Sequence, residues 1–373
     1  MARKQFLSFL LIFSLLISCA SALAEADDDD DWDDNVDDAW EMEHPLHSGD
    51  YAYALLDDGT VEITSYGGAD TEIVIPDTLD GKPVTAIGER AFYYSLSLTS
   101  VTIPDSVTHI SQKAFSCCFQ LTSITLPSGL TAIESGTFDL CKSLTTIDIP
   151  DSVAAIADDA FIGCKALQSF TLSPNHPYFF LADGALCRTA DSTLLLYPNA
   201  REPRTYRIPD GITAISAYAF YDCDLLESVV VPDSVTQLPA RAFSGCSALA
   251  SVSLPDSLTE IGTAAFSGCS ALTGIRIPAA ITEIINHTFS GCTSLATLEI
   301  PDSVTKIGDY AFFGCTSLTS IAIPDSVTAI GNGAFSNCTA LTLTVTPDSY
   351  AAEYAKANNI PYTYPDANDW LNN

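Results

Sequence analysis

The amino-acid sequence predicts a solenoid of about ten to eleven coils, each built from a short strand and short helical or 3₁₀ turns. A phenylalanine recurs with a constant step (115 − 92 = 23; 243 − 220 = 23) in two runs, at Phe92, Phe115, Phe138 and Phe161, and at Phe220, Phe243, Phe266, Phe289, Phe312 and Phe335. An aliphatic residue followed by proline recurs in the same register, for example at Ile103-Pro104, Leu126-Pro127, Val231-Pro232 and Ile323-Pro324. A fixed period in this range, with apolar residues in register, is typical of stacked repeats.

Each repeating unit can be interpreted as one coil. Leu318, Ile321 and Ile323 end in apolar alternation, which predicts a short strand. Residues 324–326, Pro-Asp-Ser, end that strand and provide turn chemistry. A tight helical turn then begins at the next Ala-Phe pair, which contains Phe335. Stacking would place equivalent residues of neighbouring coils about 4.8 Å apart, so the phenylalanines should form a buried ladder.

The two ends and one interruption depart from this unit. Residues 49–80 contain Asp58-Gly59 between apolar runs, which predicts a β-hairpin cap. Residues 342–365 include a short amphipathic stretch and predict a helical cap. Residues 173–207 interrupt the period, because the step from Leu172 to Ile208 is longer than one repeat (208 − 172 = 36), and we predict a hairpin there that projects from the solenoid.

The N-terminus is typical of an export signal. Arg3 and Lys4 precede an apolar run too short to span a bilayer, and residues 1–24 are predicted to be a signal peptide. Two processing sites fit: cleavage after Ala24, or lipidation of Cys19 in a lipobox-like sequence. Residues 25–48 are rich in aspartate and predict a disordered spacer, while residues 366–373 form a tail.

Charge limits the class of partner. The 373 residues carry 47 Asp and Glu against 15 Lys and Arg, a formal net charge of −32. Nucleic-acid binding requires clustered Lys and Arg side chains that contact phosphates. This acidic composition does not favour such clusters, so we expect no nucleic-acid binding. No stretch of the sequence predicts a transmembrane segment, and lipidation of Cys19 would provide a lipid anchor.

The repeated motif Ala-Phe-x-x-Cys-x-x-Leu-x-x-Ile-x-Ile-Pro-Asp-Ser-Val-Thr-x-Ile resembles the BspA-type leucine-rich repeat. The resemblance extends over about residues 51–364 and implies a leucine-rich repeat solenoid, for which we predict a domain over residues 49–365. It also implies a role in adhesion or protein binding at a bacterial cell surface. The partner would be a protein, or an extracellular-matrix or cell-surface macromolecule, and its identity is unknown.

A cysteine lies three positions after nine of the phenylalanines, at Cys118, Cys141, Cys164, Cys223, Cys246, Cys269, Cys292, Cys315 and Cys338. A spacing of one full repeat matches no zinc motif, which needs close pairs. The cysteines are therefore interpreted as small buried residues, with disulfides between neighbouring coils as the alternative.

The sequence contains no motif for catalysis or for a cofactor. It has five histidines, of which only His44 and His47 are close together in the sequence, and neither a nucleophile elbow nor a phosphate-binding loop. We therefore predict that the protein is not an enzyme and has no cofactor or metal.

Candidate partner-binding residues lie on the outward positions of the strands and in the interruption. The strand positions are Thr99, Thr102, Thr122, Thr125, Thr145, Asp148, Glu227, Thr273, Arg276, Glu299 and Thr319. The positions in the interruption are His176, Tyr178, Arg188 and Tyr197. We expect an exported protein-binding or adhesion module that uses both surfaces. The alternative is a structural surface-coat component without a discrete ligand.

Overall fold

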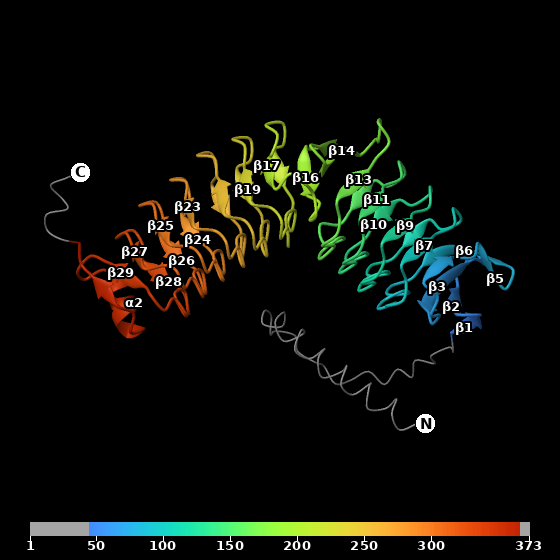
Figure 1. Cartoon of the computed structure of the whole chain (residues 1–373), viewed down its shortest axis with the longest axis horizontal. Helices are drawn as coiled ribbons and strands as arrows, with labels where there is room; N and C mark the ends of the chain where they lie inside the picture. The colour runs from blue at the N-terminus through green and yellow to red at the C-terminus, as the bar shows by residue number, and fades with distance from the viewer. Residues whose placement is uncertain (1–44, 366–373) are drawn as a thin grey trace, which may run out of the picture. The chain divides into compact units, whose positions relative to one another are not determined.

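The structure is a computed structural model and describes residues 45–365. The predicted signal peptide with Cys19, the predicted spacer as far as residue 44 and the tail 366–373 lie outside the described residues. The described part is a solenoid of about 13 turns, and its coils stand side by side in chain order (Figure 1). The solenoid and its repeat length are as predicted. The turns outnumber the ten to eleven expected, because the cap and the interruption also contribute turns to the stack.

One side of each coil is a three-residue strand, and these strands form the strand face. Neighbouring strands pair in parallel, as where Val229 lies opposite Val252. The middle side chain points inward and the two flanking ones point outward, as the sequence alternation predicts. The strand face comprises β4 (Glu72–Val74), β7 (Ser100–Thr102), β9 (Ser123–Thr125), β11 (Thr146–Asp148), β13 (Ser169–Thr171), β17 (Thr205–Arg207), β19 (Ser228–Val230), β21 (Ser251–Ser253), β23 (Gly274–Arg276), β25 (Thr297–Glu299), β27 (Ser320–Ala322) and β29 (Thr342–Thr344).

A second side of each coil is a two-residue strand that follows the Pro-Asp-Ser turn. In this ladder Ile307 lies opposite both Ile284 and Ile330, and each of these isoleucines is buried. Its strands are β8 (His109–Ile110), β10 (Ala132–Ile133), β12 (Ala155–Ile156), β18 (Ala214–Ile215), β20 (Gln237–Leu238), β22 (Glu260–Ile261), β24 (Glu283–Ile284), β26 (Lys306–Ile307) and β28 (Ala329–Ile330).

The third side, here called the turn face, contains the Ala-Phe pair. Its hydrogen bonds join residues three apart, as from Cys246 N to Phe243 O, and Phe243 N donates to Ala265 O of the next coil. A continuous helix does not form, because left-handed residues flank the phenylalanine at Arg241 (φ 57°) and Gly245 (φ 80°). Glycine adopts this conformation without strain, which explains its frequency two positions after the phenylalanine.

Both caps follow the predicted chemistry. The N-terminal cap contains β1 (Leu46–Ser48), β2 (Tyr51–Leu55), β3 (Val61–Tyr66), β5 (Thr78–Leu79) and β6 (Lys82–Ile87). β1 pairs with β2, so the cap begins at Leu46, ahead of the predicted boundary at residue 49. At the other end, helix α2 (Tyr350–Ala357) begins at Ser349, whose hydroxyl accepts a hydrogen bond from Ala352 N, and β30 (Tyr362–Thr363) pairs with β29.

The interruption at 173–207 is part of the core, and the prediction that it projects as a surface hairpin is wrong. Strands β14 (Phe179–Ala182), β15 (Ala185–Arg188) and β16 (Thr193–Leu196) form a sheet, and β16 continues in parallel to β18. Tyr197 takes the place of the missing ladder phenylalanine, one period before Phe220 (220 − 197 = 23), and stacks on Phe220 at 5.4 Å between ring centroids. The apolar runs of this segment therefore fill the core of a modified coil.

The inserted sheet separates two hydrophobic cores. Leu186 and Leu195 belong to the core of the N-terminal block, residues 45–172. Leu194 and Tyr197 belong to the core of the C-terminal block, residues 208–365. Alternate side chains of the inserted strands thus point to opposite blocks.

Within residues 45–365, no helix is both long and apolar enough to cross a membrane.

Candidate functional site

The strand face carries the outward residues that the sequence nominated. In the N-terminal block, some of the threonine hydroxyls bond to the neighbouring coil. Thr122 Oγ1 donates to Thr99 O at 2.8 Å, and Thr145 Oγ1 donates to Thr122 O at 3.4 Å. These threonines lie one residue before β9 and β11 and join neighbouring coils, whereas the outward Thr102, Thr125 and Asp148 have no side-chain hydrogen bond to another residue between 45 and 365.

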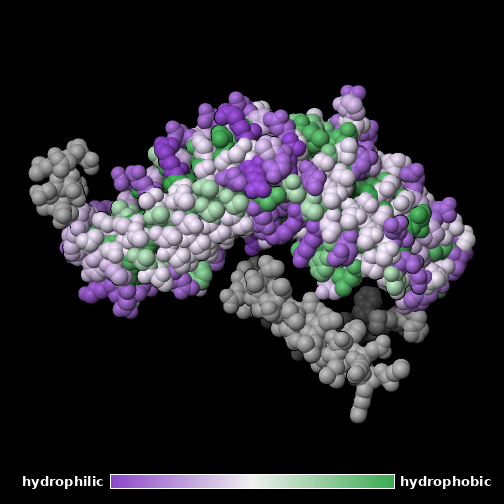
Figure 2. All heavy atoms as spheres, viewed as in Figure 1, coloured by the Kyte–Doolittle hydropathy of each residue, from purple (hydrophilic) through white to green (hydrophobic). Residues whose placement is uncertain are grey.

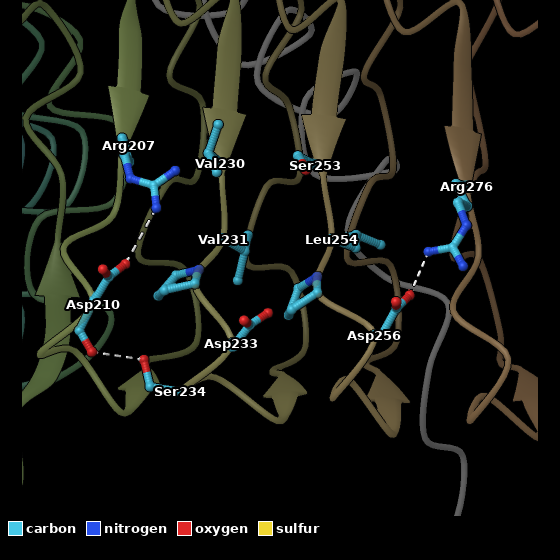
Figure 3. Close-up of a pocket in the computed structure, with 12 residues that line it drawn as sticks. Arg207, Asp210, Val230, Val231, Asp233, Ser234, Ser253, Leu254, Asp256 and Arg276 are labelled. Carbon is cyan, nitrogen blue, oxygen red and sulfur yellow. Dashed lines mark hydrogen bonds and ion pairs between the residues drawn. The ribbon is translucent and has the colours of Figure 1, made fainter.

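In the C-terminal block, the strand face is hollowed. The last outward positions of β17, β19, β21 and β23 are occupied by Arg207, Val230, Ser253 and Arg276. The two arginines border a depression of about 600 Å³, whose floor includes Val231 and Leu254 (Figure 3). Since the arginines are three coils apart, their α-carbons are about 14 Å from each other.

A second depression of about 770 Å³ adjoins the first and shares Arg276 with it. Small outward residues, Gly274 and Ala322, leave this space open, and Glu299 lines it. In the N-terminal block, the position equivalent to Ala322 holds larger side chains such as Thr125 and Asp148. We call the two depressions together the strand-face groove.

Charges of both signs line the groove and are exposed to solvent. Arg207 pairs with Asp210 at 3.3 Å, and Arg276 pairs with Asp256 at 2.5 Å. Asp233 lies between these pairs (Figure 3) and forms no ion pair with any residue of the described range 45–365. Because both ion pairs are mostly exposed, each contributes at most about 1 kcal/mol to stability, and a partner could exchange them at little cost.

Only some of the residues that the sequence predicts as partner contacts lie in the strand-face groove. Arg276 and Glu299 line the groove, whereas Glu227 is paired with Arg204 at 3.2 Å outside it. Sequence reasoning missed Arg207, although it lies three periods before Arg276 (276 − 207 = 69). An alignment of coils by position would have found the pair.

Only some of the residues nominated in the interruption are exposed to solvent. His176 and Tyr197 are buried, so their assignment as partner contacts is wrong. Arg188 is held by Asp191, with Nη2 to Oδ2 at 2.8 Å, and this contact lowers the pKa of Asp191 to about 2. Tyr178 is exposed, and a hydrophobic area in Figure 2 lies where Figure 1 labels β14, the strand that includes the exposed Leu181.

The nine cysteines of the motif have a structural role that their spacing alone did not reveal. Each Sγ donates a hydrogen bond to the carbonyl oxygen of the ladder aromatic residue in the preceding coil, over distances of 2.9 to 3.8 Å. Burial raises the pKa of the Cys118 and Cys292 thiols to about 12. A buried thiol that stays protonated is a poor nucleophile and a poor metal ligand.

Known structures share this architecture. A leucine-rich cell surface protein from Faecalibacterium prausnitzii is 31% identical, with 88% of this chain and 97% of that chain covered and a TM-score of 0.50. A leucine-rich repeat protein from Eubacterium ventriosum is 24% identical, covering 78% and 93% of the chains with a TM-score of 0.60. The pneumococcal vaccine antigen PcpA is 17% identical over 87% and 99%, also with a TM-score of 0.60. The last two show the fold alone.

No protein with a curated description matches the chain. The model of the BspA type leucine rich repeat region matches in six copies, over residues 71–180 and 208–343. The unmatched gap overlaps the inserted sheet, where the repeat register changes. The matched segments cover more than half of the sequence, and the chain therefore belongs to the BspA-type leucine-rich repeat family.

Proposed function

We propose that the protein is exported and acts as a protein-binding or adhesion module whose contact surface is the strand-face groove. One observation carries the proposal: the outward positions are hollowed and charged over β17 to β29, and the small Ala322 lies in the hollow where the equivalent N-terminal positions hold larger side chains such as Thr125 and Asp148. A rigid, elongated surface of this kind suits an extended partner that crosses several coils.

The groove also indicates the chemistry of the partner. Arg207 and Arg276 can bind carboxylates, while Asp233 and Glu299 can bind cations. The floor adds apolar contacts from Val231 and Leu254. An extended polypeptide segment with charges of both signs fits this arrangement, and no catalytic step is part of the proposal.

Export is supported by the predicted signal peptide at 1–24 and by the 31% identical relative, which is described as a cell surface protein. The two processing routes have different products. Lipidation of Cys19 would incorporate a labelled fatty acid and retain the protein in membranes, whereas cleavage after Ala24 would release it.

A binding panel tests the proposal. Immobilised extracellular-matrix and cell-surface proteins are probed with the parent protein, with Arg207→Ala/Arg276→Ala and with Ala322→Trp, which fills the groove. Loss of both arginines should weaken binding about tenfold or more, as expected for hot-spot residues. Lys306→Ala is the matched control, because it removes a similarly exposed ion pair, with Glu283, on the two-residue ladder. If the parent binds and the groove variants bind equally well, the groove is not the contact surface.

A further inference from the structure

The strand-face groove carries charges in a regular order along the solenoid. From β17 to β25 it is lined in turn by Arg207, Asp233, Arg276 and Glu299. These side chains alternate in sign, and each belongs to a later coil than the one before it. The order of its charges is therefore a property of the groove in addition to its hollow shape.

The spacing of these charges follows from the stacking of the coils. Asp233 lies one coil after Arg207, Arg276 three coils after it and Glu299 four (230 − 207 = 23; 276 − 207 = 69; 299 − 207 = 92). At about 4.8 Å per coil, the three are about 5, 14 and 19 Å along the solenoid from Arg207. In an extended polypeptide, the alternate residues that follow a given one are about 7, 13 and 20 Å from it. The two series agree to within about 2 Å.

The four charged side chains are accessible to a partner. The side chains of Arg207 and Arg276 are 66% and 70% exposed. Asp233 and Glu299 are exposed, and neither forms an ion pair with another residue between 45 and 365. Figure 3 shows both guanidinium groups turned towards the space between them, with Asp233 in between. A ligand that lies along the groove can therefore contact charges of both signs.

The alternation of signs disfavours a uniform polyanion as the occupant. Asp210 and Asp256 already face the two arginines, and Asp233 adds a third carboxylate to the same depression. A sulfated polysaccharide would bring its anionic groups close to these carboxylates as well as to the arginines, and like charges repel. The apolar floor, with Val231 and Leu254, suits the methylene groups of glutamate and lysine side chains. A polypeptide with charges of both signs fits better.

We propose that the groove selects an extended polypeptide segment with the pattern acidic-x-basic-x-acidic-x-basic. This inference rests on the proposed function, since it specifies the sequence that the groove would recognise. The two acidic residues pair with Arg207 and Arg276, and the two basic residues pair with Asp233 and Glu299. The intervening residues point away from the groove, because successive side chains of an extended strand point to opposite faces.

Two synthetic peptides of equal composition test the pattern. The alternating peptide is Thr-Glu-Thr-Lys-Thr-Glu-Thr-Lys-Thr, and its isomer is Thr-Thr-Thr-Glu-Lys-Glu-Lys-Thr-Thr. The isomer has its glutamates and lysines on opposite faces, so it leaves at least half of the four contacts unmade. Fluorescence anisotropy of the dye-labelled peptides, titrated with the full chain, measures both affinities. The alternating peptide should bind about tenfold more tightly than the isomer.

A charge exchange at one position identifies the contact. Arg276→Glu should weaken binding of the alternating peptide about tenfold. The same variant should bind a peptide whose second glutamate is replaced by lysine about as tightly as the parent protein binds the alternating peptide. The parent should bind this lysine peptide about tenfold more weakly than the alternating one, although the chain has a net charge of −32. The control is Lys306→Glu, which reverses an exposed charge on the two-residue ladder and should leave both affinities unchanged.

Equal affinities for the two isomeric peptides would overturn the inference, and so would a charge exchange that does not restore binding. Tighter binding of dextran sulfate that is lost in Arg207→Ala/Arg276→Ala would also overturn it, because the ligand would then be a polyanion. If panel proteins bind through the groove while neither peptide binds, the sequence pattern is wrong and the proposed function stands. If panel proteins bind without the groove, the proposed function itself fails.

Discussion

Cys246 donates a hydrogen bond of 2.9 Å from its Sγ to the carbonyl oxygen of Phe220 in the preceding coil. The same carbonyl accepts the backbone N–H of Cys223 at 3.3 Å, so both of its lone pairs are used. A buried carbonyl on the turn face thus gains a second partner that is small and largely apolar. This requirement explains why cysteine recurs beside the phenylalanine ladder, and it links each coil to the next.

Replacement of a ladder cysteine should therefore destabilise the protein. Cys269→Ala removes the hydrogen bond to Phe243 O, 3.1 Å long, and leaves a small void. We expect a loss of about 1–3 kcal/mol in the free energy of unfolding, measured by urea denaturation. Ser267→Ala removes a partly exposed hydroxyl that has no hydrogen bond to another residue between 45 and 365, and it should change this free energy by less than about 0.5 kcal/mol. Equal stabilities for the two variants would show that the thiol bond is dispensable.

The buried thiols also predict a loss of stability in alkali. Burial raises the pKa of Cys118, Cys187 and Cys292 to about 12, whereas an unfolded cysteine has a pKa of about 8.5. Unfolding then releases protons above a pH of about 8.5, so stability is full below that pH and falls as pH rises towards 12. Each such thiol should cost about 2 kcal/mol by pH 10. Urea midpoints measured between pH 7 and 10 test this, and a flat profile would contradict it.

Tyr197 should behave as a ladder aromatic although it lies outside the repeat motif. It is buried, it stacks on Phe220, and its hydroxyl donates to Pro203 O at 3.3 Å. Tyr197→Ala should lower the free energy of unfolding by about 3–5 kcal/mol, as Phe266→Ala should in a regular coil. Tyr197→Phe keeps the ring and should cost about 1 kcal/mol. A small effect of Tyr197→Ala would mean that the inserted sheet is not part of the core.

The repeat period was enough to predict most of the fold but little of the candidate functional site. Phe, Leu, Ile and the Pro-Asp-Ser turn recur at fixed positions, so their burial and the strand face could be predicted from the period alone. The burial of Tyr197 was not predicted, because a tyrosine in a segment that interrupts the repeat is typical of a surface. Its position one period before Phe220 was the signal for a core residue. The groove was not predicted from the sequence, because it depends on the small size of Gly274 and Ala322. No sequence motif indicates the space that these residues leave open.

His176 should anchor the inserted sheet to the N-terminal block. Its Nε2 lies 3.0 Å from Pro150 O and donates to it, while Nδ1 accepts the N–H groups of Tyr178 and Phe179 at 3.3 and 3.2 Å. His176→Ala leaves these backbone groups without their partner and should cost about 1–3 kcal/mol. Hydrogen exchange should show faster exchange at Phe179. The control Asn175→Ala changes the exposed neighbour, and exchange should be unaffected there.

The two cores separated by the inserted sheet should respond separately to core mutations. Phe138 belongs to the core of the N-terminal block, and Phe289 to that of the C-terminal block. Because each coil of a solenoid contacts only its neighbours, a local loss of stability spreads through adjacent coils and weakens at an interface. Phe138→Ala, which removes about 3–5 kcal/mol of local packing, should speed amide exchange throughout the N-terminal block and leave Phe289 protected. Phe289→Ala should show the reverse pattern. If either variant speeds exchange equally in both blocks, the inserted sheet couples the two cores and does not divide them.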